Sequence, residues 1–216
     1  MSQCIFENNV LKKIKAFKEK KILVSMSGGL DSTVLAYLLL KNNFKISVAH
    51  VNYSLRGNES LKNEKFVRDF CKSNKLKLHL KKIRKGKLNK SIQIEARKIR
   101  YDWFKKVLID FNYDLISTGH HLDDNIENIL IGMFRNPSRN NLTLIPEQNK
   151  NILRPFLNEK KDDIISYAKA NKIDFSVDSS NSQDYYLRNR IRNILIPEIE
   201  RIDKILQKKS LTLLKK

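Results

Sequence analysis

The chain has few of the residues on which several classes of protein depend. Cys4 and Cys71 are its only cysteines, and they stand far apart, outside any CxxC pattern. The sequence therefore offers no zinc or iron–sulfur framework and fits a reducing compartment. No apolar run approaches the length of a membrane span, and the N-terminus lacks an apolar segment before a small-residue cleavage site. We expect an intracellular protein without membrane contact, in a bacterial cytoplasm or a plastid interior.

Acidic residues are scarce relative to basic ones. The chain has 43 Lys and Arg against 23 Asp and Glu, which gives a formal net charge of +20. Such a surplus favours a polyanionic partner, because each basic contact to a phosphate releases counterions. The alternative is codon bias, since the chain has only 6 Gly and 4 Pro and is rich in Lys, Asn and Ile. Bias alone does not explain why acidic residues are so few.

Short apolar runs alternate with longer amphipathic segments, which is typical of an α/β fold with a doubly wound, mostly parallel, Rossmann-like sheet. A loop of turn formers begins at Asn136, so we place a soft boundary there. Residues 1–136 form the main domain, and 137–216 form a lid, linker and basic helical tail that includes a helix from an Asn158 cap to Ala170. The expected strands are 22–26, 46–51, 76–83 and 114–118, and the expected helices are 8–19, 32–42, 60–74, 91–111 and 122–135.

The segment Ser27-Gly28-Gly29-Leu30-Asp31-Ser32 lies between an expected strand and an expected helix. Two glycines allow a sharp turn and a close approach to a ligand, and N–H groups at the helix N-terminus face the same point. Phosphate or pyrophosphate is the expected occupant. Neither GxxxxGK(S/T) nor GxGxxG occurs in the chain, so the two commonest phosphate loops are excluded. The alternative is a plain turn in which Asp31 caps the helix.

The second expected strand ends in the sequence HVNYSLRG, residues 50–57. In a doubly wound sheet, ligands bind outside the carboxyl ends of the strands, so this segment and SGGLDS should open onto one crevice. A lone histidine at a strand end, such as His50, is more often structural than catalytic. Arg56, at a glycine turn, is the better candidate to contact a ligand, and we expect that ligand to be nucleic acid.

The expected helix 91–111 carries Arg97 and Arg100 on one flank. We expect its buried stripe to consist of Ile92, Ala96, Ile99, Trp103 and Val107, which recur at helical spacing. Two arginines three residues apart can clamp a triphosphate with their planar guanidinium groups. For this segment alone, an ordinary solvated helix is the simpler interpretation.

The fourth expected strand leads into GHHLDDNIEN, residues 119–128. Gly119 permits a close turn, and one aspartate can cap the following helix, in which we expect Ile126, Ile129, Leu130 and Met133 to bury one side. Asp124 and Glu127 are three residues apart, so both can face the crevice. Paired carboxylates near a phosphate site can hold Mg²⁺ or accept a proton from an attacking amine. A structural role accounts for one Asp and leaves the second Asp, the Glu and the two His without a reason.

The SGGLDS segment resembles the PP-loop of the ATP pyrophosphatases. Taken with HVNYSLRG, EARKIRY, GHHLDDNIE, LRPF and RNRIR in this order, it resembles the tRNA(Ile)-lysidine synthase family over about residues 20–197. The resemblance implies an ATP-dependent ligase that acts on the isoleucine tRNA with a CAU anticodon. ATP adenylates the C2 oxygen of the wobble cytidine and releases pyrophosphate. Free L-lysine then attacks that carbon and expels AMP, which leaves lysidine.

The family's functional residues map onto motifs of this chain. The resemblance implies that residues 27–32, with Arg97, Gly119 and His120, bind ATP, and that Asp31 and Asp124 hold Mg²⁺. It implies catalytic roles for Asp31, Arg97, Asp124 and Glu127, the last two handling lysine and proton transfer. The RNRIR arginines, Arg188, Arg190 and Arg192, fit phosphate contacts to the tRNA, with a solvated helix as the alternative. The oligomeric state stays open, with a homodimer among the alternatives.

The chain departs from the family at three positions, since Tyr53, Asn125 and Asn128 stand where His, Gln and Thr are common. Many members also carry extra C-terminal tRNA-binding domains, for which the basic charge of this chain would compensate. Two rivals stay open: a non-catalytic RNA-binding relic, and another PP-loop ligase or tRNA-modifying enzyme with a different acceptor. The three acids Asp31, Asp124 and Glu127 argue against the relic, because carboxylates repel phosphate.

Overall fold

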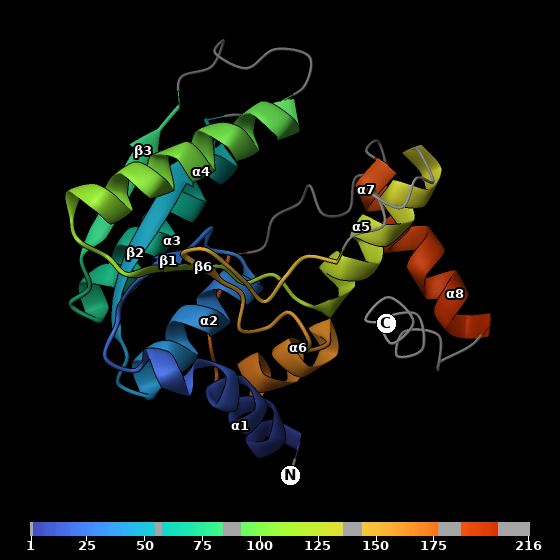
Figure 1. Ribbon diagram of the computed structural model, residues 1–216, viewed down its shortest axis with the longest axis horizontal. Coiled ribbons are helices and arrows are strands. Elements are labelled where there is room, and N and C mark those ends of the chain that lie inside the picture. Colours follow the sequence, from blue (N-terminus) through green and yellow to red (C-terminus); the bar gives the residue numbers. More distant parts are fainter. Residues whose placement is uncertain (1, 55–57, 84–91, 136–143, 177–186, 203–216) are drawn as a thin grey trace.

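The computed structural model describes residues 2–54, 58–83, 92–135, 144–176 and 187–202. At its centre lies one sheet with the strand order β3-β2-β1-β4-β6-β5, in which every pair is parallel except β5 with β6 (Figure 1). This confirms the expected α/β fold with a mostly parallel sheet. The strands are β1 (Lys21–Ser25), β2 (Lys45–Asn52), β3 (Leu78–Lys82), β4 (Leu115–Ser117), β5 (Gln148–Asn149) and β6 (Ile152–Leu153).

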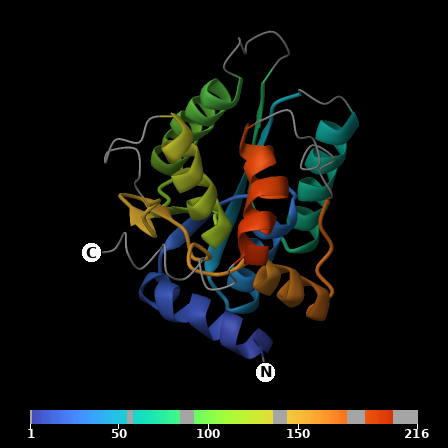
Figure 2. The ribbon, with the colours of Figure 1, turned by 90° about the vertical axis from the view of Figure 1, so that its right-hand side faces the viewer.

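Helices cover both faces of the sheet, as alternation along β1 requires. Ile22 and Val24 point into the larger core, which they share with α1 (Ser2–Ile14), α2 (Leu30–Lys41), α3 (Asn58–Ser73) and α6 (Lys161–Ala170). Leu23 points the other way, against Phe104 and Val107 of α4 (Ile92–Asp110). Successive side chains of a strand face opposite sides, so one five-residue strand contributes to both cores. Figure 2 shows α3 and α4 on opposite sides of the sheet.

The C-terminal helices lie beside α5 (Leu122–Arg135) (Figure 1). They form a continuous helical segment made of α7 (Leu187–Arg190), the π-helical turn η4 (Ile191–Leu195) and α8 (Ile196–Ile202). Both α7 and η4 contact α5. This is the expected helical appendage, and it brings the arginines of RNRIR next to the helix that follows β4.

Several expectations about elements were wrong in detail. The first helix spans Ser2–Ile14 and gives way to the 3-10 turn η1 (Lys15–Phe17), instead of running over 8–19. Asn158 does not cap α6, because its amide donates to Glu147 and the residue before the helix is Lys160. On α4, Trp103 is only partly buried, whereas Phe104, which the expected stripe omitted, is buried.

Strands β5 and β6 were not predicted, since two residues each are too short for a period-2 pattern. Their parent segment, 144–176, also supplies Phe156 and Tyr167 to the larger core. The parts before and after residue 136 share one sheet and one core. A division into two domains at that residue stays a prediction. In the ranges described here, no helix is long and apolar enough to cross a membrane.

The sheet order reverses between β1 and β4. Chain segments that leave the carboxyl ends of these two strands diverge, which creates a crevice at that edge. The SGGLDS segment follows β1, and the GHHLDD segment follows β4. The topology therefore places both motifs at the same opening.

Candidate active site

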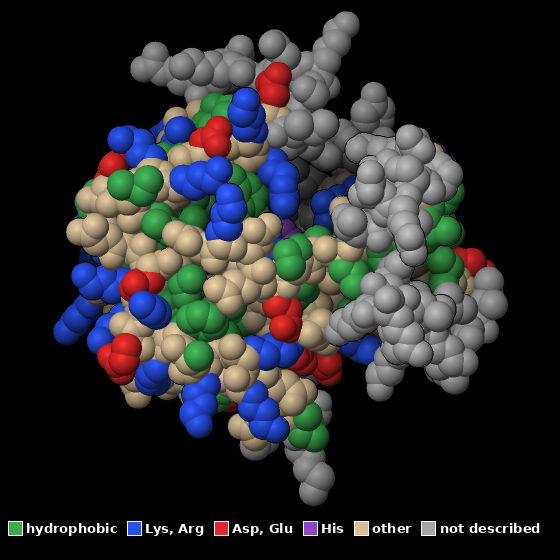
Figure 3. All heavy atoms as spheres, in the orientation of Figure 1, with side chains coloured by type: hydrophobic (Ala, Val, Ile, Leu, Met, Phe, Trp, Pro, Cys, Tyr) green, Lys and Arg blue, Asp and Glu red, His purple; other side chains and the backbone are tan. Residues whose placement is uncertain are grey.

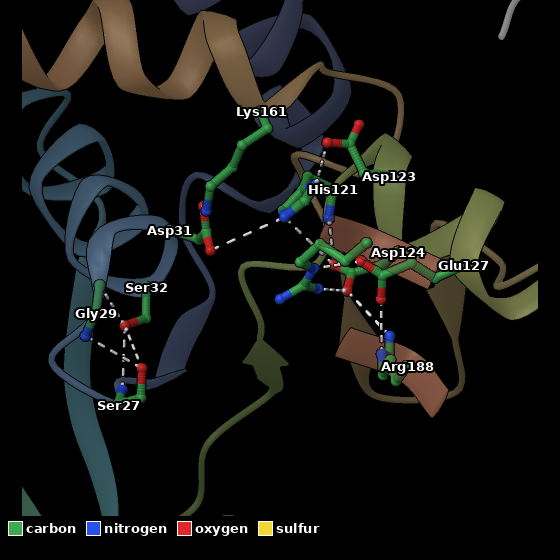
Figure 4. A network of polar contacts seen from close by, with 11 residues as sticks. Ser27, Gly29, Asp31, Ser32, His121, Asp123, Asp124, Glu127, Lys161 and Arg188 are labelled. Carbon is green, nitrogen blue, oxygen red and sulfur yellow. Dashed lines mark hydrogen bonds and ion pairs between the residues drawn. The ribbon is translucent and has the colours of Figure 1, made fainter. Parts of the chain in front are cut away.

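The turn after β1 is held by its own polar groups. Gly28 has a φ of +95°, a conformation that L side chains rarely adopt, so glycine is required there. The backbone N–H of Ser27 donates to Ser32 Oγ at 3.1 Å, and the N–H of Gly29 donates to Ser27 Oγ at 3.2 Å (Figure 4). Thr33 Oγ1 donates to the Gly29 carbonyl at 2.9 Å. These hydrogen bonds fix the turn. The N–H groups in the first turn of α2, which lack intrahelical partners, lie at its open side.

A cavity of about 550 Å³ opens above this turn. Its lining combines residues from the turn after β1, the loop after β4 and several helices. The lining residues include Ser27, Gly29, Leu30, Asp31 and Ser32 from the first turn, Arg100 and Tyr101 from α4, Gly119, His120 and Asp124 after β4, Lys161 from α6, Phe175 and Ser176, and Arg192 from η4.

Gly119 lets the two loops touch backbone to backbone. A Cβ atom on Gly119 would lie 3.0 Å from the carbonyl carbon of Asp31 and 3.1 Å from the amide nitrogen of Ser32. Real Cβ atoms essentially never come within 3.0 Å of other heavy atoms, so these distances lie at the limit. The glycine predicted to allow a close turn therefore also sets the distance between the loops after β1 and β4.

His121 lies between the acidic residues of the two loops (Figure 4). Its Nε2 is 3.9 Å from Asp31 and 3.8 Å from Asp124, and its Nδ1 is 3.9 Å from Asp123. The ring is 4 % exposed. Sequence analysis selected His120 and missed His121, although the paired histidines were the only signal for either. The structure shows that His121 is the histidine whose ring lies between Asp31 and Asp124.

His120 lies against a different set of groups. Its Nδ1 is 2.8 Å from Thr118 Oγ1. Burial lowers the pKa of His120 to about 4, and the positive charges of Arg154, Arg97 and Arg100 act in the same direction, against the field of Asp124. At neutral pH the ring is therefore uncharged and able to donate or accept a hydrogen bond at the cavity wall.

Asp124 and Glu127 are the acidic pair of α5, and both are buried. Arg188 donates through Nε to Glu127 at 2.7 Å and through Nη2 to Asp124 at 3.1 Å. Arg192 pairs with the same two carboxylates. Burial opposes ionisation of Asp124, but the nearby histidines, the N–H of His121 and Arg188 hold the pKa of this carboxyl below its ordinary value. Two carboxylates and two guanidiniums thus form a charge-balanced cluster beside the cavity.

This cluster explains why the expected apolar side of α5 was partly wrong. Met133 is 53 % exposed, whereas Glu127 is 0 % exposed. The helix turns its acids inward because α7 and η4 present arginines to them. Apolar periodicity alone could not show this, since the partners lie more than 60 residues further along the chain.

The comparisons with known proteins agree with this geometry. Residues 2–199 match the family model described as the PP-loop domain. The chain belongs to the PP-loop family. It is 35% identical over 189 residues to the tRNA(Ile)-lysidine synthase of Bacteroides thetaiotaomicron, covering 86% of this chain and 44% of that protein. It is 39% identical over 202 residues to the tRNA(Ile)-lysidine synthase of Persephonella marina, covering 89% and 44%. The chain spans less than half the length of these two relatives.

Solved structures share the fold at low identity. The U34-tRNA thiolase NcsA from Methanococcus maripaludis superposes with a TM-score of 0.76 at 17% identity, over 98% of this chain and 79% of that one. The NH3-dependent NAD synthetase from Campylobacter jejuni gives a TM-score of 0.55 at 14% identity, over 99% and 90%. At these identities the likeness shows the fold alone.

Not every predicted residue of the PP-loop site lines the cavity. Arg100 does, whereas Arg97 is exposed, with its guanidinium carbon 4.9 Å from the centre of the Tyr101 ring. Contact of Arg97 with ATP stays a prediction. Arg56 lies outside the described residues, and Arg190 is exposed on α7. Arg188 and Arg192 are only partly exposed and face the acids, so their predicted contact with tRNA would compete with the ion pairs just described.

The PP-loop site offers a fitting but incomplete set of ligands for Mg²⁺. Asp31 and Asp124 both line the cavity, on either side of His121. In the part of the chain that the structure describes, no group of three or more His, Cys, Asp or Glu is arranged to hold a metal ion. Mg²⁺ commonly binds through one or two carboxylates together with phosphates of the substrate. The residues present fit that mode and do not form a site for a tightly held resident ion.

Proposed function

We propose that this chain uses ATP to activate the C2 oxygen of the wobble cytidine in the CAU-anticodon isoleucine tRNA, and then joins free L-lysine to C2. One observation carries the proposal: the turn after β1 and Asp124 of α5 line the same cavity, and Glu127 shares its two arginine partners with Asp124 beside that cavity. A phosphate cradle alone would fit any PP-loop protein. An adjoining acidic pair supplies what an incoming amine requires. The names of the relatives, tRNA(Ile)-lysidine synthases, support this choice of substrate.

In the first half-reaction, the turn Ser27–Ser32 would receive the β- and γ-phosphates. Its backbone is fixed before the ligand arrives, so the turn needs little reorganisation when charge develops on the leaving pyrophosphate. Arg100 supplies a positive charge at the cavity wall. Mg²⁺ held by Asp31 and Asp124 would neutralise phosphate charge in that step.

In the second half-reaction, Asp124 and Glu127 would bind the lysine side chain and accept a proton from its amine. The guanidiniums of Arg188 and Arg192 pair with both carboxylates and hold them in place beside the cavity. Bond formation between the amine nitrogen and C2 then expels AMP. The uncharged ring of His120, next to Asp124 in the cavity lining, provides a further polar contact.

The tRNA would be attracted by the basic outer surface. Lys and Arg side chains are spread over the face in Figure 3, while Asp and Glu are sparser. Exposed Arg190 on α7 lies near the acidic cluster and is the RNRIR arginine best placed to meet a phosphate. Function as a homodimer remains a further prediction.

The rival is an RNA-binding relic without catalysis. The two buried carboxylates of α5 do not by themselves exclude the relic, because a buried charge is tolerated when it is paired. Here the arginines supply the pairing, so only a reaction can separate the two proposals.

The test is mass spectrometry of the isoleucine tRNA after incubation with the protein, ATP and L-lysine. We expect the mass of one lysine residue to be added at the wobble cytidine, together with release of pyrophosphate. Asp31→Ala should abolish both, whereas Asp102→Ala, the same change at an exposed position of α4, should preserve both. Intact tRNA binding by the wild-type protein with neither product would favour the relic.

A further inference from the structure

Lys161 is a basic residue of the site that sequence analysis did not select. It is the first residue of α6, and its side chain is 33 % exposed. Its ammonium forms an ion pair with Asp31 of the SGGLDS turn, 130 residues away in sequence (Figure 4). Lys161 also lines the same cavity as Asp31 and Ser32. It therefore places a positive charge beside the turn that is expected to hold phosphate.

The position of Lys161 is not explained by the helix that carries it. The N-terminus of a helix has a partial positive charge, so a cation in the first turn is unfavourable there. The next two residues, Asp162 and Asp163, have the sign that stabilises a helix start. Lys161 is thus placed against the local preference of α6, and the contact that it makes is with the turn after β1.

Among the described residues, the basic side chains that line the cavity are Arg100, Lys161 and Arg192, and Lys161 pairs with one carboxylate whereas Arg192 pairs with two. Arg192 is committed to Asp124 and Glu127, as its ion pairs show. Arg100 and Lys161 line the cavity as well. A lysine ammonium is a compact charge with three donors on a flexible stem, which suits it to follow phosphate oxygens from one partner to another.

We propose that Lys161 is a ligand of the departing pyrophosphate. Its ammonium, paired with Asp31 in this structure, turns to oxygens of the β- and γ-phosphates when ATP binds, which frees the Asp31 carboxylate for Mg²⁺. The C2 oxygen of cytidine attacks the α-phosphorus, and the bond from this phosphorus to the bridging oxygen of the β-phosphate breaks. Pyrophosphate leaves with that electron pair, and the step transfers no proton from Lys161. The inference rests on the proposed use of ATP.

The test compares Lys161→Met with Lys160→Met, which removes the same charge from the neighbouring exposed lysine. Calorimetry measures binding of pyrophosphate and of AMP to the full chain in the presence of Mg²⁺. Loss of a charge-assisted contact should weaken pyrophosphate binding about tenfold or more in the Lys161→Met variant. AMP binding should change by less than about threefold, because AMP lacks the β- and γ-phosphates. Lys160→Met should match the wild type for both ligands, and Lys161→Arg should keep part of the pyrophosphate affinity.

Three outcomes would overturn the inference while leaving the proposed function intact. These are unchanged pyrophosphate binding in Lys161→Met, an equal loss of AMP and pyrophosphate binding, and an equal effect of Lys160→Met. If the wild-type protein binds neither ATP nor pyrophosphate, the proposed function and the inference both fall. If Lys161→Met selectively loses pyrophosphate binding but the wild-type protein makes no lysidine, the inference is supported and the proposed tRNA acceptor is refuted.

Discussion

Replacing Gly119 with alanine should force apart the two loops that form the site. The new Cβ would lie 3.0 Å from the carbonyl carbon of Asp31, 3.1 Å from its oxygen and 3.1 Å from the nitrogen of Ser32. Carbon atoms pack favourably at about 3.5–4.0 Å, so the loops must separate by roughly 0.5 Å or more. All three contacted atoms belong to the backbone, so no rotamer change can relieve the clash. Overpacking of this kind costs about 1–3 kcal/mol of folding free energy.

Urea unfolding and the rate of pyrophosphate release measure the two consequences of Gly119→Ala. We expect a lower unfolding midpoint and a release rate reduced about tenfold to hundredfold, since a misplacement near 1 Å has effects of that order. Gly29→Ala is the matched control for stability: among the described residues its Cβ would meet only Ser27 Oγ, at 3.5 Å, and its φ of −74° suits alanine. The reasoning is refuted if both variants unfold at the same urea concentration and Gly119→Ala releases pyrophosphate at the wild-type rate.

Further predictions concern charge. Glu127→Gln removes the buried negative charge that pairs with two arginines, at a cost of roughly 2 kcal/mol, so hydrogen exchange of residues 187–202 should become about tenfold faster or more. Glu198→Gln, which breaks an exposed pair, should leave these exchange rates unchanged. Equal exchange rates in the two variants would contradict the prediction. The pKa of His120 is lowered from 6.5 to about 4, so the unfolded chain binds a proton that the folded protein does not, and stability falls as pH drops between these values. Urea midpoints of His120→Gln should depend less on pH in that window, and an unchanged dependence would exclude the effect. Binding of tRNA should weaken steeply with added salt, given the net charge of +20, and a flat response in filter binding would remove the electrostatic argument.

The sequence was sufficient to predict those parts of the molecule that local pattern determines. The four longer strands, the helices between them and the turn at residues 27–32 follow from apolar runs, glycines and helix-start residues that are close in sequence. Ion pairs between distant segments leave no such pattern. From the sequence, Lys161 is predicted to begin a surface helix, and Arg188 and Arg192 are predicted to face RNA. In the fold, Lys161 pairs with Asp31, and the two arginines pair with Asp124 and Glu127.

This pairing also changes what the net charge means. Lys161 with Asp31, and the two arginines with the two acids of α5, balance one another at the cavity. These ion pairs contribute nothing to the surplus of +20, and on the face in Figure 3 Lys and Arg are spread over the surface. Long-range attraction of a polyanion should act at that outer surface, where salt screens it, whereas the proposed nucleotide would be held by short-range donors inside the cavity. Binding of ATP should accordingly respond to salt far less than binding of RNA, although both ligands carry phosphate groups and, under the proposed function, both would meet at this site.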